Sequence, residues 1–174
     1  MDLYHGLSHE IPFNIQKSGV RSVVTIHDLI FRIYPKTFPF IDRTIYDIKF
    51  RNSCMNSDRI VAISNSTKQD IVEHYDIRPE KIDVVYQSCD PIYYEDGTDI
   101  NLLNQLGLPN EYLLYVGSVE PRKNLKSIIG TYEHFAQSSQ IPLVVVGRGK
   151  KYKQEVMNMV AERNLGKLIL WYDD

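Results

Sequence analysis

The stretch that decides the fold is YLLYVGSVEPRKNL, residues 112–125. An apolar run ends at Gly117, and two cations, Arg122 and Lys123, stand just before a segment of helical periodicity. The apolar run predicts a strand, and glycine allows the chain to turn tightly after it. Pro121 favours a turn or a helix entrance. We therefore expect a strand, a turn and a helix in that order.

The same alternation recurs along the chain. Expected strands span residues 20–28, 59–64, 81–86, 112–117, 141–147 and 167–172, and expected helices span 41–55, 66–75, 125–136 and 151–163. This rhythm is typical of an α/β fold with parallel sheets. Ser66 and Gln69 are spaced as a capping box. The helix at 41–55 carries apolar residues that fit one helix face: Ile41, Ile45, Ile48 and Met55.

A boundary is expected between residues 87 and 110, where Pro, Gly and Asp-Gly interrupt the rhythm. We place a first unit at 1–92, a linker at 93–110 and a second unit at 111–174. The chain opens on the pattern of a strand end and closes on an apolar strand, KLILWYDD. These ends suggest a piece of a longer protein.

Composition narrows the function classes. The 174 residues carry a formal net charge of -2, so non-specific nucleic-acid binding has no electrostatic support. Cys54 and Cys89 form no CxxC pair and are interpreted as buried side chains in a reducing compartment. No apolar run is long enough for a membrane span, and no signal peptide is recognised. His5, His9 and Glu10 do not match a zinc motif, so no metal is expected.

In an open α/β sheet, ligands bind beyond the carboxyl ends of the strands. Turns with suggestive chemistry follow three expected strands: His27-Asp28, Gly117–Asn124 and Gly147–Gly149. Arg122 and Lys123 oppose the dipole of the expected helix, which makes sense if an anion lies there. The alternative, that both cations are solvated, stays open. So does a purely structural role for His27 and for the second glycine turn.

Four segments together resemble a known family: VVTIHDLIFRIYP, SDRIVAISNSTKQDIVEHYDIRPEKIDVVYQSCD, YLLYVGSVEPRKNLKSIIGTYEHF and LVVVGRGKK. They are similar to the family 4 retaining glycosyltransferases of GT-B fold, most of all to mannosyltransferase-like bacterial members. The resemblance implies two Rossmann-like parallel-sheet domains, of which the N-terminal one binds the acceptor. Residues 1–92 then correspond to the later half of the acceptor domain, and 111–174 to the first half of the nucleotide-sugar domain.

The resemblance also implies roles for single residues. His27 matches a catalytic-site histidine that faces the transferred sugar, and Lys123 matches the lysine that holds the donor diphosphate. Gly117 matches the turn glycine near the donor. Ser118 stands where many members carry an arginine, and Arg122 is the candidate substitute. His5 and Gly6 resemble the loop on the acceptor side.

By this resemblance a hexose, with mannose as first candidate, moves with retention from a nucleotide-diphosphate sugar to a glycan or lipid-linked acceptor in polysaccharide biosynthesis. No cofactor or metal is implied, and the protein is expected in the cytoplasm with peripheral contact to the inner membrane face. The family's E-x7-E carboxylates should come after Asp174, so we expect the isolated chain to be inactive. The alternative is a non-catalytic remnant or a nucleotide-binding α/β fragment without transferase activity.

Overall fold

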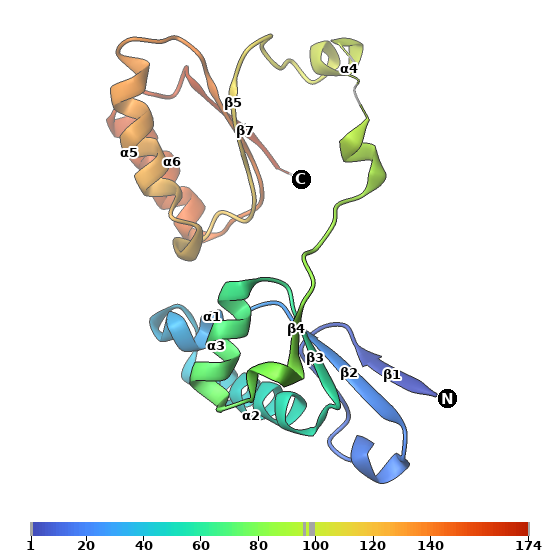
Figure 1. The fold of residues 1–174 in the computed structure, drawn as a ribbon. Coiled ribbons are helices and arrows are strands. Elements are labelled where there is room, and N and C mark those ends of the chain that lie inside the picture. Colours follow the sequence, from blue (N-terminus) through green and yellow to red (C-terminus); the bar gives the residue numbers. More distant parts are fainter. Residues whose placement is uncertain (1, 96, 98–99, 174) are drawn as a thin grey trace. The chain divides into compact units, whose positions relative to one another are not determined.

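The computed structural model describes residues 2–95, 97 and 100–173, so residues 96 and 98–99 of the expected linker lie outside the described part. The chain divides into two compact units, Met1–Glu95 and Asp96–Asp174 (Figure 1). Each unit is built on its own parallel sheet, with strand orders β1-β2-β3-β4 and β5-β6-β7. The α/β class with parallel sheets is thus confirmed.

The first unit contains four parallel strands joined through helices. The strands are β1 (Leu3–Gly6), β2 (Arg21–Ile26), β3 (Arg59–Ala62) and β4 (Ile82–Val84), and the helices are α1 (Ile30–Ile33), α2 (Phe40–Asn56) and α3 (Asn65–Tyr75). Short 3-10 turns occupy Ile15–Ser18, Pro35–Thr37, Pro79–Lys81 and Pro91–Tyr94. Ile26 pairs with Ala62, and Ala62 with Val84. Because all neighbours are parallel, the strands end at one common edge.

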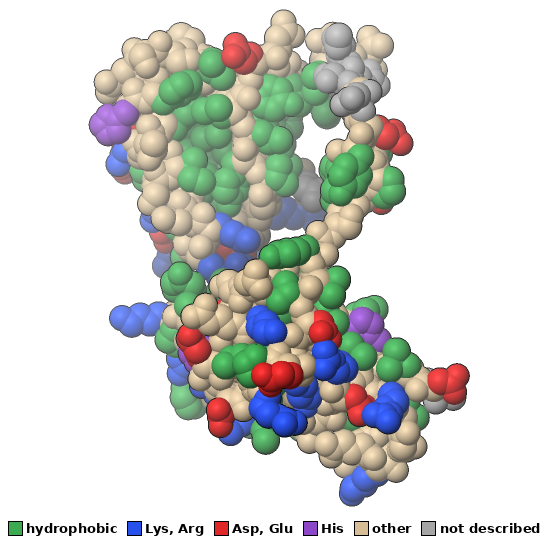
Figure 2. Space-filling view, in the orientation of Figure 1, with side chains coloured by type: hydrophobic (Ala, Val, Ile, Leu, Met, Phe, Trp, Pro, Cys, Tyr) green, Lys and Arg blue, Asp and Glu red, His purple; other side chains and the backbone are tan. Residues whose placement is uncertain are grey.

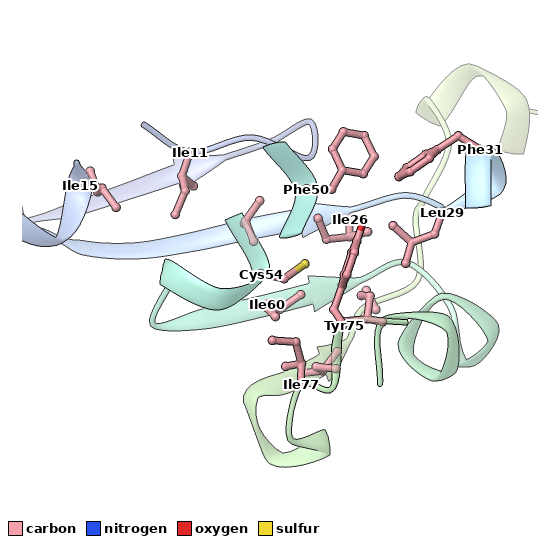
Figure 3. Packing of buried hydrophobic residues seen from close by; sticks show 14 residues of the cluster. Ile11, Ile15, Ile26, Leu29, Phe31, Phe50, Cys54, Ile60, Tyr75 and Ile77 are labelled. Carbon is pink, nitrogen blue, oxygen red and sulfur yellow. The ribbon is translucent and has the colours of Figure 1, made fainter. Parts of the chain in front are cut away.

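The core of this unit lies between the sheet and its helices (Figure 3). Val24 and Ile26 are fully buried because the side chains of β2 alternate between its two faces. Phe50 and Cys54, one turn apart on α2, enter the same cluster. Burying an aliphatic or aromatic side chain of this size stabilises a fold by about 1.5–3 kcal/mol. The unit therefore has a hydrophobic core of its own.

Helix α2 forms where it was expected, but the expected face is wrong. Ile41, Ile45, Ile48 and Met55 are 70%, 45%, 57% and 53% exposed. The buried residues are Phe50, Ser53 and Cys54. Ser53 is buried because its hydroxyl accepts a hydrogen bond from the backbone of Ile11 at 3.0 Å. The apolar pattern alone could not predict the buried face of α2, because that face includes the polar residue Ser53.

The cysteines differ from each other. Cys54 is buried as expected, and burial raises the pKa of its thiol to about 12. Cys89 is exposed, so its expected burial is wrong. It lies beyond β4 in a run of exposed residues that includes Tyr86 and Ile92. Cys89 is exposed because the whole segment after β4 is exposed, although a cysteine side chain is apolar enough to be buried.

The cap of α3 is Ser64, and the capping box assigned to Ser66 and Gln69 is wrong. Ser64 has extended backbone angles, and its hydroxyl accepts the N–H of Thr67 at 3.1 Å. The Gln69 amide instead donates to Glu73 at 2.8 Å. The helix begins one residue earlier than the sequence pattern indicated.

Replacing the cap tests this assignment. We expect Ser64→Ala to lower the free energy of unfolding of the first unit by about 1 kcal/mol, because one N–H at the start of α3 loses its acceptor. Ser66→Ala is the matched control, because Ser66 is the second residue of α3 and does not cap it. This substitution should change stability little. Urea denaturation followed by circular dichroism measures both. A larger loss in the control would contradict the assignment.

The second unit repeats the plan with three parallel strands. Its elements are α4 (Ile100–Gln105), β5 (Leu113–Val116), α5 (Leu125–Ala136), β6 (Leu143–Val146), α6 (Lys151–Glu162) and β7 (Ile169–Tyr172), with a 3-10 turn at Pro121–Lys123. The buried residues of α5 are Leu125, Ile129, Tyr132 and Ala136. Ile128 and Phe135 are 39% and 37% exposed, so the buried face is narrower than expected. The core lies between the sheet and α5 and α6.

Candidate functional site

The turns that follow β5 and β6 run side by side at the carboxyl edge of the second sheet, where Val119 and Gly149 form a parallel bridge. The N–H of Gly117 donates to the Val146 carbonyl at 3.0 Å, and that of Gly147 to the Tyr172 carbonyl at 2.9 Å. Both glycines have φ near +150°, at 150° and 152°. A Cβ on Gly147 would lie 2.0 Å from the Gly117 carbonyl oxygen. Only glycine fits at Gly147, where the two turns run side by side in close contact.

A cavity of about 500 Å³ opens between these turns. The Val119 N–H donates to the Arg148 carbonyl at 2.8 Å and ties one turn to the other. The cavity is lined from both sides, by residues that include Ser118, Glu120, Pro121, Arg148, Gly149 and Lys150. The two turns that the sequence singled out separately therefore form one site.

Arg122 and Lys123 differ in their surroundings. Arg122 is half-buried and forms an ion pair with Glu120, with 3.4 Å between guanidinium nitrogen and carboxylate oxygen. Glu120 also accepts a hydrogen bond from the Ser118 hydroxyl. Lys123 is exposed, and its ammonium group makes no hydrogen bond or ion pair within residues 2–95, 97 and 100–173. The charge on Lys123 is thus free for a ligand, whereas that on Arg122 is partly offset.

Both cations lie before α5 and not in its first turn. Pro121, Arg122 and Lys123 form a 3-10 turn, and Asn124 caps α5 with a left-handed backbone, φ 54°. Pro121 therefore begins a 3-10 turn that precedes α5, which is the first of the two roles expected of it. Asn is one of the few residues that adopt this conformation readily. Lys123 therefore stands two residues before the first residue of α5.

More positive charge surrounds the cavity than the sequence argument assigned to it. Arg148, Lys150 and Lys151 are exposed and form no ion pair with any described residue. In Figure 2, Lys and Arg side chains gather at the end of the second unit that carries the turns after β5 and β6. Such a cluster favours an anionic ligand.

A buried lysine holds one of these turns in place. Lys153 is only 8% exposed, and its ammonium group donates to the Gly147 carbonyl at 3.2 Å and to the Asp173 carboxylate. It also lies over the Trp171 ring, 5.3 Å from the centroid. No role of its own was predicted for Lys153 from the sequence. Lys153 is the third residue of α6, and its side chain lies at the strand ends. This could be predicted only if the residues on the buried face of α6 were already known.

The first unit brings its own expected residues to the carboxyl edge of its sheet. Gly6 ends β1, and a Cβ there would lie 2.1 Å from the Glu10 carbonyl oxygen. His5, on the same strand, bonds Thr25 on β2 at 2.9 Å through its Nε2. His27 follows β2 directly. The three residues assigned to the acceptor side and the catalytic position thus lie on neighbouring strands.

His27 is held on several sides. Its Nε2 lies 3.0 Å from the Leu7 carbonyl oxygen, and its Nδ1 lies 3.3 Å from the amide nitrogen of Gln87. Its backbone N–H donates to Nδ1 of His9 at 3.4 Å, and its carbonyl accepts from Thr67 at 3.0 Å. Sequence reasoning named neither Gln87 nor His9 as a partner of His27. No sequence signal joins Gln87 to His27, since 60 residues separate them.

His9 packs between His27 and the hydrophobic core. Its ring stacks on Phe50, with centroids 4.3 Å apart, and meets the His27 ring edge-on at 5.0 Å. Burial, and secondly the neighbouring His27, lower the pKa of His9 below its ordinary value of 6.5, while Asp28 and Glu10 oppose the shift. The backbone of His9 is left-handed, with φ 65°. A neutral ring is needed for Nδ1 to accept from His27.

A pH series tests the buried neutral state of His9. Because its pKa is lowered in the folded chain, the unfolded chain binds more protons below pH 6.5, so the contribution is complete above that pH and is lost as pH falls. We expect the free energy of unfolding to drop more steeply from about pH 7.5 to pH 5 in the wild type than in His9→Asn. Asn tolerates the left-handed backbone. Equal slopes in denaturant titrations would contradict the assignment.

Among the described residues, no group of three or more His, Cys, Asp and Glu side chains could hold a metal ion. Likewise, within that part of the chain, no helix combines the length and the apolar character needed to cross a membrane.

Comparison with known proteins decides the family. Residues 4–91, half of the chain, match the sequence model of Glycosyltransferase Family 4. The chain belongs to glycosyltransferase family 4. This family 4 chain is 24% identical over 168 residues to O-antigen chain mannosyltransferase B of Escherichia coli, which covers 92% of the chain. It is 28% identical over 147 residues to the serotype-specific mannosyltransferase WbdA of Escherichia coli, over 76% of the chain. It spans 42% and 17% of the lengths of these relatives.

Solved structures confirm the GT-B type of fold. The crystal structure of Anabaena HepE in complex with UDP and glucose matches 99% of this family 4 chain at a TM-score of 0.72 and 16% identity, and the chain covers 47% of it. WaaG, a glycosyltransferase of lipopolysaccharide biosynthesis, matches 92% of the chain at 0.66 and 14% identity, with 50% of WaaG covered. At these identities the likeness concerns the fold alone.

Proposed function

We propose that the cavity beside Gly117–Asn124 binds the diphosphate of a nucleotide sugar, and that the full-length protein transfers the sugar, a hexose, to a hydroxyl acceptor. The observation that carries this proposal is the cavity between the two turns, which is lined by the unpaired cations Arg148 and Lys150. Lys123 is not one of its lining residues, but its unpaired ammonium group belongs to the same short 3-10 turn as Pro121, which lines the cavity. Neighbouring like charges repel each other, and a bound anionic ligand would relieve this repulsion.

The chemistry of transfer fits these residues. As the bond to the sugar breaks, negative charge grows on the departing nucleotide diphosphate, and fixed cations stabilise that charge more in the transition state than in the ground state. Lys123 acts as the main phosphate contact. Ser118 and Arg122 share Glu120, so their part is to shape the turn and to reach the diphosphate only as Glu120 releases them. We expect no metal or other cofactor to take part, and the nucleotide sugar itself counts as a substrate.

The first unit is assigned to the acceptor. His27 faces the transferred sugar from the carboxyl edge of its sheet, with His5 and Gly6 on the neighbouring strand. In this assignment residues 1–92 supply the later half of the acceptor domain, and 111–174 the first half of the donor domain. Support comes from the match of residues 4–91 to the family and from the likeness of both units to GT-B enzymes.

Mannose is the first candidate for the sugar, because several relatives are named mannosyltransferases. A glycan or lipid-linked acceptor is proposed because a 25% identical relative from Campylobacter jejuni is named for an N-acetylgalactosamine transfer to a diphospho-undecaprenol glycan. We place the reaction in polysaccharide biosynthesis, with retention of anomeric configuration, in the cytoplasm and with peripheral contact to the inner membrane face.

A transfer assay tests the proposed function. The full-length gene product is incubated with radiolabelled GDP-mannose, UDP-glucose or UDP-N-acetylglucosamine and membrane lipid extract, and the product linkage is determined by NMR. We expect label from one donor in a lipid-linked or glycan product with retained configuration. The isolated 174 residues should give no product, for want of the carboxylates expected beyond Asp174. No transfer from any donor by the full-length protein would favour the alternative, a non-catalytic nucleotide-binding remnant.

A further inference from the structure

The imidazole of His27 has a defined tautomer in this structure. Its Nε2 lies 3.0 Å from the Leu7 carbonyl oxygen. A carbonyl oxygen can only accept, so Nε2 must carry the hydrogen. In a neutral ring Nδ1 then offers a lone pair, and this atom lies 3.3 Å from the side-chain nitrogen of Gln87, which can only donate. The two contacts are mutually consistent with one neutral tautomer.

Gln87 is well placed to maintain this state. It is exposed and stands three residues beyond β4, whose end adjoins that of β3. The neighbouring Tyr86 hydroxyl accepts from Asn65 at 3.0 Å, which ties the segment after β4 to the start of α3. With its amide nitrogen toward the ring, Gln87 donates to Nδ1 and thereby favours the tautomer with hydrogen on Nε2.

We propose that Gln87 is a positioning residue that holds His27 in the neutral form protonated at Nε2, with its Nδ1 lone pair available at the edge of the site. This deepens the proposed function and rests on it for its consequence in transfer. A sugar hydroxyl that approaches His27 takes the place of the Gln87 amide and donates to Nδ1. His27 therefore acts on the sugar as a hydrogen-bond acceptor.

The charged and titratable groups that face this ring are few. His9 meets it edge-on, and its neutral ring accepts the His27 backbone N–H. Asp28 is adjacent in sequence, but its carboxylate accepts the N–H of Ile30 at 3.1 Å. Glu10, beyond His9, is paired with Lys49 at 3.0 Å. The only side chain that the structure places on a ring nitrogen of His27 is Gln87, among the described residues.

NMR of the ¹⁵N-labelled chain tests the proposal without reference to catalysis. Long-range ¹H–¹⁵N spectra at about pH 7.5 distinguish the two neutral tautomers and the charged ring. We expect the wild-type His27 ring, assigned through its loss in His27→Gln, to show the hydrogen on Nε2. Gln87→Glu places an acceptor against Nδ1 and should shift the ring toward the form with hydrogen on both nitrogens. Gln87→Met removes the donor and should raise the share of the other neutral tautomer, against the remaining preference that the Leu7 carbonyl imposes.

Gln16→Glu is the matched control, because it makes the same change of charge on a side chain whose amide donates to Asn56 at 2.9 Å. Its His27 signals should equal the wild type. A wild-type ring protonated at Nδ1, or Gln87 variants that leave the His27 signals as in the control, would overturn the proposal.

Kinetics of the full-length protein separate this inference from the proposed function. If Gln87 positions His27, Gln87→Glu lowers kcat by about 10-fold or more and changes the KM for the donor little. Unchanged kcat with the expected NMR shift would overturn the role of Gln87 in transfer. Absence of transfer in the wild type itself would overturn the proposed function, and the NMR result would still decide the tautomer.

Discussion

Lys123→Ala in the full-length protein should weaken nucleotide-sugar binding or lower kcat/KM by about 10- to 150-fold. The figure corresponds to about 1.5–3 kcal/mol for one lost charge-assisted phosphate contact. The loss should be large because Lys123 has no partner among the described residues, so its whole interaction is free for the ligand. Isothermal titration with the nucleotide sugar and steady-state transfer kinetics both measure it.

Two controls sharpen this result. Lys167 is an exposed lysine just before β7, at the opposite end of the strand from the turns, and Lys167→Ala should leave binding unchanged. Arg122→Ala should have a smaller effect than Lys123→Ala, because Glu120 already offsets the guanidinium charge. Equal binding by wild type and Lys123→Ala would contradict the assignment of the diphosphate site to this turn.

Gly147→Ala should destabilise the second unit by at least about 2 kcal/mol. The new Cβ would lie 2.0 Å from the Gly117 carbonyl oxygen, and the residue has φ 152°, which side chains rarely adopt. The two turns must then move apart, and the hydrogen bonds at the ends of β5 and β6 weaken. Urea unfolding of the isolated chain, followed by Trp171 fluorescence, reports on this unit because Trp171 lies on β7.

Gly166→Ala provides the comparison. It lies in the same unit, its Cβ would meet nothing within 4 Å, and its φ is outside the left-handed region. We expect it to leave the free energy of unfolding within about 0.5 kcal/mol of the wild type. If Gly147→Ala were equally mild, the close contact between the two turns at Gly117 and Gly147 would be incorrect.

The elements of the fold could largely be predicted from sequence, because strands and helices here have strong and distinct periods. The face of α2 could not, since Ser53 is buried through a hydrogen bond to Ile11, a residue 42 positions away. The prediction of the N-cap of α3 was wrong for a related reason. Ser64 and Ser66 are equally good caps by residue type, and only the point where β3 ends decides between them.

The candidate site shows the same limit. Lys123, His27 and the glycine turns could be picked out because they follow apolar runs, where strand ends are expected. Their partners could not. Glu120 lies beside Arg122 in sequence but was not paired with it, and Gln87 reaches His27 only through the packing of β4 against β3. Lys153 needed the phase of α6 before its contact with Gly147 could be inferred.

The central claim, that the Gly117–Asn124 turn holds the diphosphate of a sugar nucleotide, is tested most directly by calorimetry. The full-length protein and its Lys123→Ala variant are titrated with GDP-mannose, UDP-glucose, UDP-N-acetylglucosamine and the corresponding nucleoside diphosphates. We predict that one sugar nucleotide and its diphosphate bind the wild type, and that both lose about 10-fold or more in affinity in the variant. No binding by any of them, or binding that the variant leaves unchanged, would contradict the account.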